Sequence, residues 1–474
     1  MSEQTFSNYR RAKTWQIVLW PLAGGINNAF VILMMFVSYV AAGGYGIAVA
    51  LAGTIVTGTR IFDAITDPII ALISDRVNTK FGRVRILMAA GFGIMAIGVL
   101  TIFVWGIGSN IVVFTLAYMV YIIGYTIYGV AQNSANPILT NDPMQRAKLS
   151  RWSTIYTLIL SAVPSVYMSM VLFPKYGSLS VEAFQELCYT VLIFSLVLIV
   201  IAMIAVSPSD KPENFVGRSK SKVSLRDCWN VLKDNRAMQM YIVAASSDKL
   251  ALQAASQSAI STMIFGIIIG NYSFSGNLTM INMIPSFIVI FFATHLSGKG
   301  GAKKSLIQWT LYSIIAAIVM VAYMTFCDPT QISVAAVPTV IFIALNAIFS
   351  ALKMATSAIT GTMLPDIMDY EMYRSGNFMP ATVGAIYSFV DKIISSFATT
   401  IVGFCIALIG YKDVMPQPGD PSSAPLFWMA MFLWMGLPIL GWICTLIAMK
   451  WYPLDKEKMI EVQAANHAAR EAAK

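Results

Sequence analysis

The stretch VRILMAAGFGIMAIGVLTIFVWG, residues 84–106, contains one charged side chain, Arg85, near its start. At the rise of about 1.5 Å per residue of an α-helix, it is long enough to cross a hydrocarbon core of about 30 Å. Backbone groups inside lipid must form their hydrogen bonds within the spanning structure, and this stretch is too long for a barrel strand. We therefore predict a transmembrane helix here.

Eleven further stretches of the same kind predict a bundle of twelve transmembrane helices. The composition agrees, because 57% of the residues are hydrophobic and only 12% are charged, whereas soluble domains carry roughly 25% charged residues. The polar start of the chain precedes an apolar run without a small-residue cleavage site, so we expect a retained first helix rather than a signal peptide. The predicted segments are residues 15–41, 47–74, 84–106, 111–135, 152–173, 187–206, 237–269, 276–296, 305–326, 334–364, 381–409 and 426–451.

A hydrophilic segment, residues 207–236, separates six predicted helices from six more. We predict an N-terminal bundle over residues 1–206, a C-terminal bundle over 237–451 and a tail over 452–474. This layout is typical of the major-facilitator fold, in which two halves give alternating access to a site near the middle of the membrane. The predicted fold is therefore an all-α membrane protein of that type. The alternatives are a channel or a membrane-embedded enzyme.

Lysine and arginine predict the orientation of the chain. They gather in the N-terminal segment, the central loop, the tail and every second loop, while the other loops contain only Lys175 and Lys412. By the positive-inside rule, both termini are expected in the cytoplasm, and the expected location is the inner (plasma) membrane. The net charge of +9 forms no basic patch interleaved with aromatic residues, so no nucleic-acid partner is expected.

The stretch RIFDAITDP, residues 60–68, places two carboxylates inside the second predicted helix. Asp63 and Asp67 are four residues apart, so their side chains share a face with Arg60 and Thr66. Two carboxylates that meet in a membrane repel each other unless a cation or a proton lies between them. We expect a site for a coupling Na⁺ or H⁺ here and no other cofactor. The alternative is a structural pair in which Arg60 neutralises one aspartate.

Other charges in the predicted membrane segments are few, and each is a functional hypothesis because charge is costly there. On the eleventh segment, Lys392 follows Asp391 and can reach toward the helix 2 carboxylates or a substrate hydroxyl. On the seventh, Asp248 and Lys249 are adjacent and so point in different directions. We expect Lys249 to bind substrate or, alternatively, to extend to the membrane surface or pair with a neighbour. Lys353 on the tenth segment is similar.

Neutral polar side chains gather on the first and fourth predicted helices. Asn27 lies on the first, and Thr126, Gln132 and Asn133 lie on the fourth. A polyhydroxylated ligand is recognised by many modest hydrogen bonds to such amides and hydroxyls. The alternative is that they join helices to one another.

Three blocks of sequence resemble the glycoside-pentoside-hexuronide:cation symporters, the family of the melibiose carrier, and the resemblance covers nearly the whole chain. The first block is RIFDAITDP through SDRVNTKFGR, ending at residue 83. The second is LPDIMDYE, residues 364–371, leading to SFVDK at 388–392, and the third is YPLDKEK at 452–458. The family implies a transporter and not an enzyme.

The resemblance implies that Asp63, Thr66, Asp67 and Thr126 form the cation site and that Lys392 lies between cation and sugar. Thr66 stands where the melibiose carrier has asparagine, which leaves Na⁺ and H⁺ both open as the coupling ion.

On the sugar side the sequence departs from the melibiose carrier. Asn27 and Gly129 replace aspartates, and Asn133 replaces a tryptophan, so melibiose is not the expected substrate. An acidic sugar such as a uronide is one hypothesis, because the loss of these aspartates leaves Lys249 and Lys392 with fewer carboxylates to pair with. The predicted substrate-binding residues are Asn27, Gln132, Asn133, Lys249, Ser388, Asp391 and Lys392, with Arg60 and Lys392 assigned to coupling.

Charged residues near the cytoplasmic ends of both halves predict a gate. The basic loop after the second helix would pair with the acidic end of the tenth, and the alternative is that this loop only sets the orientation. The residues assigned to the gate are Asp75, Arg76, Arg83, Asp366, Asp369 and Glu371.

These observations together predict a secondary active transporter that couples Na⁺ or H⁺ to a sugar, glycoside or uronide by alternating access. Its expected partners are this small molecule and the lipid bilayer, and it is expected to function as a monomer. The alternatives are an uncoupled facilitator and a transporter of lipids or other amphiphiles on the same fold. The polar residues of the first and fourth helices argue against an amphiphile.

Overall fold

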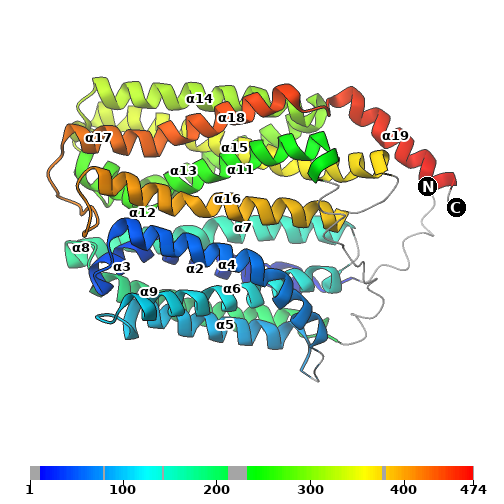
Figure 1. The fold of residues 1–474 in the computed structure, drawn as a ribbon, viewed down its shortest axis with the longest axis horizontal. Coiled ribbons are helices and arrows are strands. Elements are labelled where there is room, and N and C mark those ends of the chain that lie inside the picture. Colours follow the sequence, from blue (N-terminus) through cyan, green and yellow to red (C-terminus); the bar gives the residue numbers. More distant parts are fainter. Residues whose placement is uncertain are drawn as a thin grey trace. The chain divides into compact units, whose positions relative to one another are not determined.

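The computed structural model describes residues 11–77, 79, 81–140, 143–211, 232–375 and 380–472. Some side chains within these ranges lie outside the description, among them those of Asp67, Asp75, Arg76 and Asn133. The described residues are mostly helical, with no strand among them (Figure 1). They divide into two compact units, and the division falls within the segment predicted as the central loop. The domain limits given above stay a prediction.

The first unit contains the described residues up to 211 together with Tyr411–Met415. The latter segment belongs to it because the N–H of Val49, where α4 begins, donates to the carbonyl of Lys412 at 2.9 Å. Its helices are α1 (Thr14–Leu19), α2 (Leu22–Met34), α3 (Val37–Tyr45), α4 (Val49–Arg76), α5 (Val84–Leu100), α6 (Ile111–Leu139), α7 (Pro143–Tyr167), α8 (Phe173–Tyr176) and α9 (Val181–Val206).

Glycines bring α5 and α6 into close backbone contact. A side-chain carbon at Gly124 would lie 2.3 Å from the backbone nitrogen of Met95, and one at Gly98 would lie 2.5 Å from that of Tyr121. Helices associate in lipid largely through packing, and small residues at the interface permit this approach. The close contact fixes α6 along the part that carries Tyr121 and Thr126.

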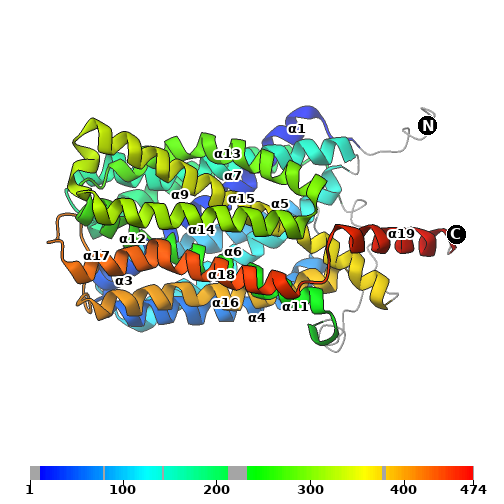
Figure 2. The same ribbon diagram turned by 90° about the horizontal axis from the view of Figure 1, so that it is seen from above.

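The second unit contains the described residues from 232 to 410 and from 416 onward. A buried cluster including Tyr241, Ile359, Met363 and Val383 holds several of its helices together. The helices are α11 (Arg236–Ala255), α12 (Ser258–Ser261), α13 (Phe274–Gly300), α14 (Ala302–Phe326), α15 (Ala336–Ser375), α16 (Pro380–Leu408), α17 (Ala424–Met431), α18 (Leu437–Trp451) and α19 (Lys456–Ala472). Helix α19 extends beyond the end of α18 (Figure 1 and Figure 2).

The helices make this a multi-pass membrane protein. Among the described residues, 10 helices are long and apolar enough to cross a membrane, and a bent pair, Arg236–Ala255 with Ser258–Ile268, raises this to 11 if it forms one span. This count leaves out α4, whose 28 residues would extend about 42 Å. The helical membrane architecture is thus confirmed, while the number of twelve spans stays a prediction.

Large apolar side chains are exposed along helices of both units. Examples are Ile193 and Ile204 on α9, and Ile284 and Phe291 on α13. A soluble monomer rarely exposes so much apolar surface. In a helical membrane protein such side chains contact lipid, because the backbone groups are already satisfied within each helix.

Candidate functional site

Asp63 lies within α4 and contacts α6. Its residue surface is only 7% exposed, and the Thr126 hydroxyl donates to its Oδ1 at 2.6 Å. Thr66, one turn later on α4, donates its hydroxyl to the Asp63 backbone carbonyl at 3.2 Å. The structure thus brings together three of the four residues predicted to hold the cation, while the side chain of Asp67 lies outside the described residues. Oxygen atoms of this kind are the ligands that small hard cations prefer.

The described residues hold no group of three or more His, Cys, Asp or Glu side chains that could form a metal cage. A transported ion does not need one. It must be released in every cycle, so a single buried carboxylate with neutral oxygens suits it better than a tight site of several charges. Asp63 with Thr126 has this chemistry, and a carboxylate can also carry a proton.

Arg60, one turn before Asp63, is surrounded by tyrosines of α6. It interacts electrostatically with Tyr118, Tyr121 and Tyr125 as well as with Asp63. The rings form a continuous column, with centroids 5.8 Å apart between Tyr118 and Tyr121 and 6.0 Å apart between Tyr121 and Tyr125. Arg60 therefore has neighbours on α6 as well as Asp63 on its own helix. The column is absent from the sequence predictions, although tyrosines three and four residues apart on one helix would have indicated it.

The Gln132 side chain of α6 packs against α2 where α2 carries glycine. A side-chain carbon at Gly24 would lie 2.9 Å from Gln132 Nε2, so the glycine makes room for this amide. Three residues further along α2, Asn27 Oδ1 is buried and has no hydrogen-bond partner among the described residues. Buried polar atoms are nearly always paired, so this oxygen is a candidate acceptor for a ligand hydroxyl or a water. The side chain of Asn133 lies outside the description.

In the second unit, an ion pair between Lys249 and Asp391 joins α11 to α16. The Asp391 side chain is 3% exposed, whereas that of Lys249 is 51% exposed. Asp391 Oδ1 is buried without a hydrogen-bond partner among the described residues. This is the pairing that was the alternative to a substrate role for Lys249. The two roles are compatible, because the exposed ammonium has further protons to donate.

The other charged residues predicted inside membrane segments of the second unit have different neighbours. Asp248 is buried and interacts electrostatically with Lys353 of α15, so it and the adjacent Lys249 have partners on different helices. This separation is what adjacent positions on a helix require. Lys392 is half-buried and Ser388 is exposed on α16, and their predicted roles stay predictions.

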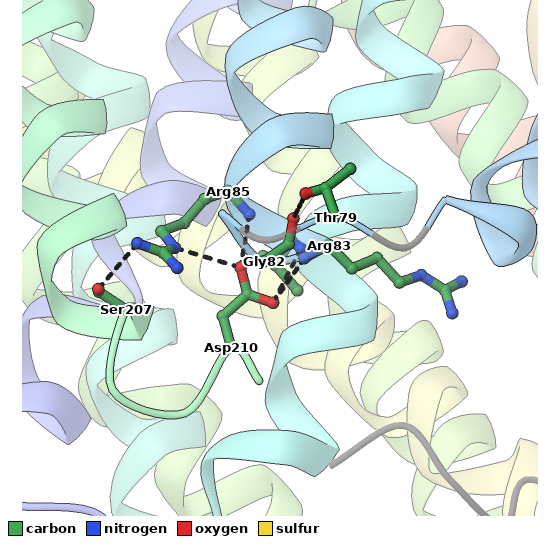
Figure 3. A network of polar contacts seen from close by, with 7 residues as sticks. Thr79, Gly82, Arg83, Arg85, Ser207 and Asp210 are labelled. Atoms are coloured by element: carbon green, nitrogen blue, oxygen red, sulfur yellow. Dashed lines mark hydrogen bonds and ion pairs between the residues drawn. The ribbon is translucent and has the colours of Figure 1, made fainter. Parts of the chain in front are cut away.

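The loop after α4 is bound by a residue that the sequence predictions did not include, Asp210. Its Oδ1 accepts hydrogen bonds from the backbone N–H groups of Arg83 (2.9 Å) and Val84 (3.1 Å), and its Oδ2 accepts one from Arg85 (3.0 Å) (Figure 3). These N–H groups lie at the start of α5, where backbone N–H groups have no acceptor within the helix. A carboxylate there also interacts favourably with the helix dipole.

Side chains complete this network. Arg85 Nε lies 3.4 Å from Asp210 Oδ2, and its Nη1 donates to Ser207 Oγ at 3.0 Å. Gly82 has φ +92, and a side-chain carbon there would lie 2.1 Å from Asp210 Oδ2. The Arg83 side chain extends away from Asp210 (Figure 3). The predicted gating loop is thus anchored through its backbone to the segment that follows α9.

The acidic residues of the predicted gate lie near the end of α15. Glu371 is buried and accepts hydrogen bonds from Asn235 Nδ2 at 2.7 Å and from Arg374 Nη2 at 2.9 Å. Asp369 uses its backbone carbonyl to accept from Asn466 of α19 at 2.8 Å. Asp366 lines a cleft beneath α19. The side chains of Asp75 and Arg76 lie outside the description, and the gate stays a prediction.

Comparison with known proteins agrees with this architecture. The family model described as MFS/sugar transport protein matches residues 22–456. The chain is 23% identical over 468 residues to the glucuronide carrier protein homolog of Escherichia coli (strain K12), covering 95% of this chain and 94% of that protein. It is 21% identical over 399 residues to the inner membrane symporter YicJ of the same organism, covering 81% of this chain and 79% of that protein.

Among solved structures, the nucleoside transporter NupG superposes with a TM-score of 0.60 over 93% of this chain and 99% of that chain. At 12% sequence identity, this likeness shows the fold alone. The major-facilitator fold predicted from the sequence is confirmed, as is the resemblance to sugar and glycoside symporters.

Proposed function

Because the chain belongs to the MFS/sugar transport protein family, we propose that it is a symporter that couples a sugar, glycoside or uronide to Na⁺ or H⁺. That it is a sugar transporter and not an enzyme follows from the family; the coupling, the ion and the substrate are the proposal. The proposal includes a location in the inner membrane with both termini in the cytoplasm.

The observation that carries the proposal is the buried Asp63 carboxylate with the Thr126 hydroxyl 2.6 Å away. A carboxylate inside a membrane segment costs a few kcal/mol and is retained where it has a function. Binding a cation or a proton removes that cost. The occupied site is therefore favoured in conformations that keep Asp63 dry, and the empty site in conformations that admit water.

Alternating access follows from this difference. Cation binding at Asp63 shifts the population toward the state that binds substrate, and it can do so only to the extent that the two states differ in cation affinity. The linkage is reciprocal, so the substrate must raise the affinity for the cation by the same factor. Lys392 is the proposed residue through which the two ligands influence each other.

An acidic glycoside is the substrate class that we propose to test first. Lys249 is half exposed while its ion-pair partner Asp391 is buried, so the ammonium can donate to a substrate carboxylate as well as to Asp391. A similar protein carries the name glucuronide carrier protein homolog, which supports the same class. Asn27 and Gln132 are the proposed partners for the sugar hydroxyls.

The experiment is uptake of labelled glycosides into proteoliposomes containing the purified protein. Neutral and acidic glycosides are each offered with a Na⁺ gradient, with a proton gradient and with neither. Symport predicts accumulation above the outside concentration for one substrate with one gradient. Equilibration without accumulation under all gradients would instead identify an uncoupled facilitator.

A further inference from the structure

A second candidate site lies in the second unit, where α14 begins. A cleft of about 680 Å³ opens between the first turns of α14 and the start of α19. Three lysines and two carboxylates line it, which leaves one net positive charge. The charged and amide residues of the lining are Lys303, Lys304, Gln308, Asp455, Lys456 and Glu457.

The N-terminus of α14 adds to the positive charge. Helix α14 begins at Ala302, and its N-cap residue Gly301 (φ +88) has no side chain to accept from the first N–H groups. Those groups and the helix dipole favour an anion at this end. The start of α19 differs, because Asp455 Oδ1 accepts from the Lys458 N–H at 2.8 Å and so caps that helix. One of the two carboxylates in the cleft is thereby engaged.

Tyr452 lies beside the cleft and connects its two walls. Tyr452 lines an adjoining cleft of about 350 Å³ that shares Gly301, Asp455 and Lys456 with the first. The residue is 2% exposed, and its hydroxyl forms no hydrogen bond among the described residues. Its backbone carbonyl accepts from Lys303 Nζ at 2.6 Å, which holds the end of α18 against the start of α14. The hydroxyl itself is enclosed by the protein, so Tyr452 supports the wall of the cleft and does not offer this group to a ligand.

An apolar track leads away from the lysines along α14. From Lys304 and Gln308 the same face continues through Leu311, Ile315 and Ile318, all exposed, with Ile315 at 58%. Positions three and four residues apart share one face of a helix.

The neighbouring helix α18 also exposes apolar side chains. It lies beside α14 (Figure 1 and Figure 2) and exposes Ile447 and Trp451 near its end. Tryptophan is enriched where a membrane meets water. Trp451 therefore indicates that this end of α18, and the cleft beside it, lie at the level of lipid headgroups.

We propose that this cleft binds the headgroup of an anionic phospholipid. The lipid phosphate lies against Lys304, Lys456 and the open start of α14, and its acyl chains follow the exposed track of α14 and the exposed apolar side chains of α18. A soluble anion would use the same positive charges but not the track, and a zwitterionic lipid would use the track with less of the charge. The bound lipid stabilises the junction of α14, α18 and the tail helix α19.

The test is native mass spectrometry of the detergent-purified full-length protein, titrated with phosphatidylglycerol or with phosphatidylcholine of the same chain length. We expect tighter binding of phosphatidylglycerol to wild type. Lys304→Gln should weaken it about fivefold, since one lysine near an anionic surface contributes about that factor. Lys304→Arg should retain it. Lys233→Gln, which removes an exposed lysine outside the cleft, is the matched control and should leave binding unchanged.

Three outcomes would overturn the proposal. The first is equal affinity for the two lipids, and the second is a Lys304→Gln variant that binds like wild type although Lys304→Arg and Lys233→Gln behave as expected. The third is displacement of phosphatidylglycerol by inorganic phosphate at equal concentration, which would identify a site for soluble anions.

Discussion

The Thr126 hydroxyl lies 2.6 Å from Asp63 Oδ1, and this hydrogen bond joins α6 to α4 at the predicted cation site. Thr126→Val keeps the shape of the side chain but removes the hydroxyl. Groups that orient a metal ligand change affinity by about 10- to 100-fold, so we expect the apparent cation affinity to fall by about tenfold. The measurement is substrate uptake as a function of cation concentration.

Thr126→Ser keeps the hydroxyl and should keep wild-type cation affinity. Thr115→Val, on the same helix, removes a hydroxyl that bonds only to the backbone carbonyl of Ile111 and should change nothing. A Thr126→Val variant with unaltered cation dependence would show that this hydroxyl has no part in the ion site.

The contact between α5 and α6 predicts that Gly124 tolerates no side chain. Gly124→Ala would place a carbon 2.3 Å from the Met95 backbone nitrogen, and backbone cannot move aside as a flexible side chain can. Overpacking of this kind costs about 1–3 kcal/mol, so the thermal unfolding temperature in detergent should fall. Gly129→Ala is the control, because a side-chain carbon at that position of the same helix would contact nothing within 4 Å. Equal unfolding temperatures for the two variants would refute the close contact.

The anchor at Asp210 predicts a loss of stability in Asp210→Ala. The variant removes the acceptor for three N–H groups at the start of α5, and loss of a helix cap costs about 2 kcal/mol at most. Gly82→Ala should also destabilise, because its side chain would collide with Asp210 Oδ2. The double variant should lose less than the sum of the two, since the collision with the carboxylate is then absent and only the strain at φ +92 and the approach to the Asp210 carbonyl at 2.9 Å remain. Additive effects on the unfolding temperature would contradict this arrangement.

The Lys249 and Asp391 pair predicts a variant and its repair. Lys249→Ala leaves the Asp391 carboxylate buried without its cation, at a cost of about 2 kcal/mol once the exposure of Lys249 is considered. Adding Asp391→Asn removes the buried charge and should restore the unfolding temperature. Binding of an acidic glycoside should stay weak in this double variant if Lys249 also contacts the substrate. Recovery of binding together with stability would assign the pair a purely structural role.

The fold was predictable because every membrane-spanning segment must satisfy its backbone hydrogen bonds internally. An apolar stretch of about 20 residues or more therefore identifies a transmembrane helix in the sequence. Helix ends were less predictable. The tenth segment was expected to end at Leu364, before Pro365, but α15 continues through this proline to Ser375. The continuation is polar, so it resembles a loop in composition, and contacts with α19 such as Asn466 to Asp369 support it in place of lipid.

The candidate site was predictable where its residues are close in sequence or resemble a family motif. Asp63 and Thr66 lie one turn apart, and the resemblance supplied Thr126. The role of Asp210 was not predictable, because it binds residues 83–85 across more than one hundred positions of sequence. No local pattern reports such a pairing. The same holds for Asn27, whose buried and unpaired oxygen depends on which helices surround it.

The central claim is that Asp63 binds the coupling cation, and the most direct measurement is the affinity of the purified protein for its labelled glycoside with and without that cation. The account predicts that the cation tightens glycoside binding in the wild type and that Asp63→Asn abolishes this effect while glycoside still binds. A variant whose glycoside affinity still rises with cation, by the same factor as in the wild type, would contradict it.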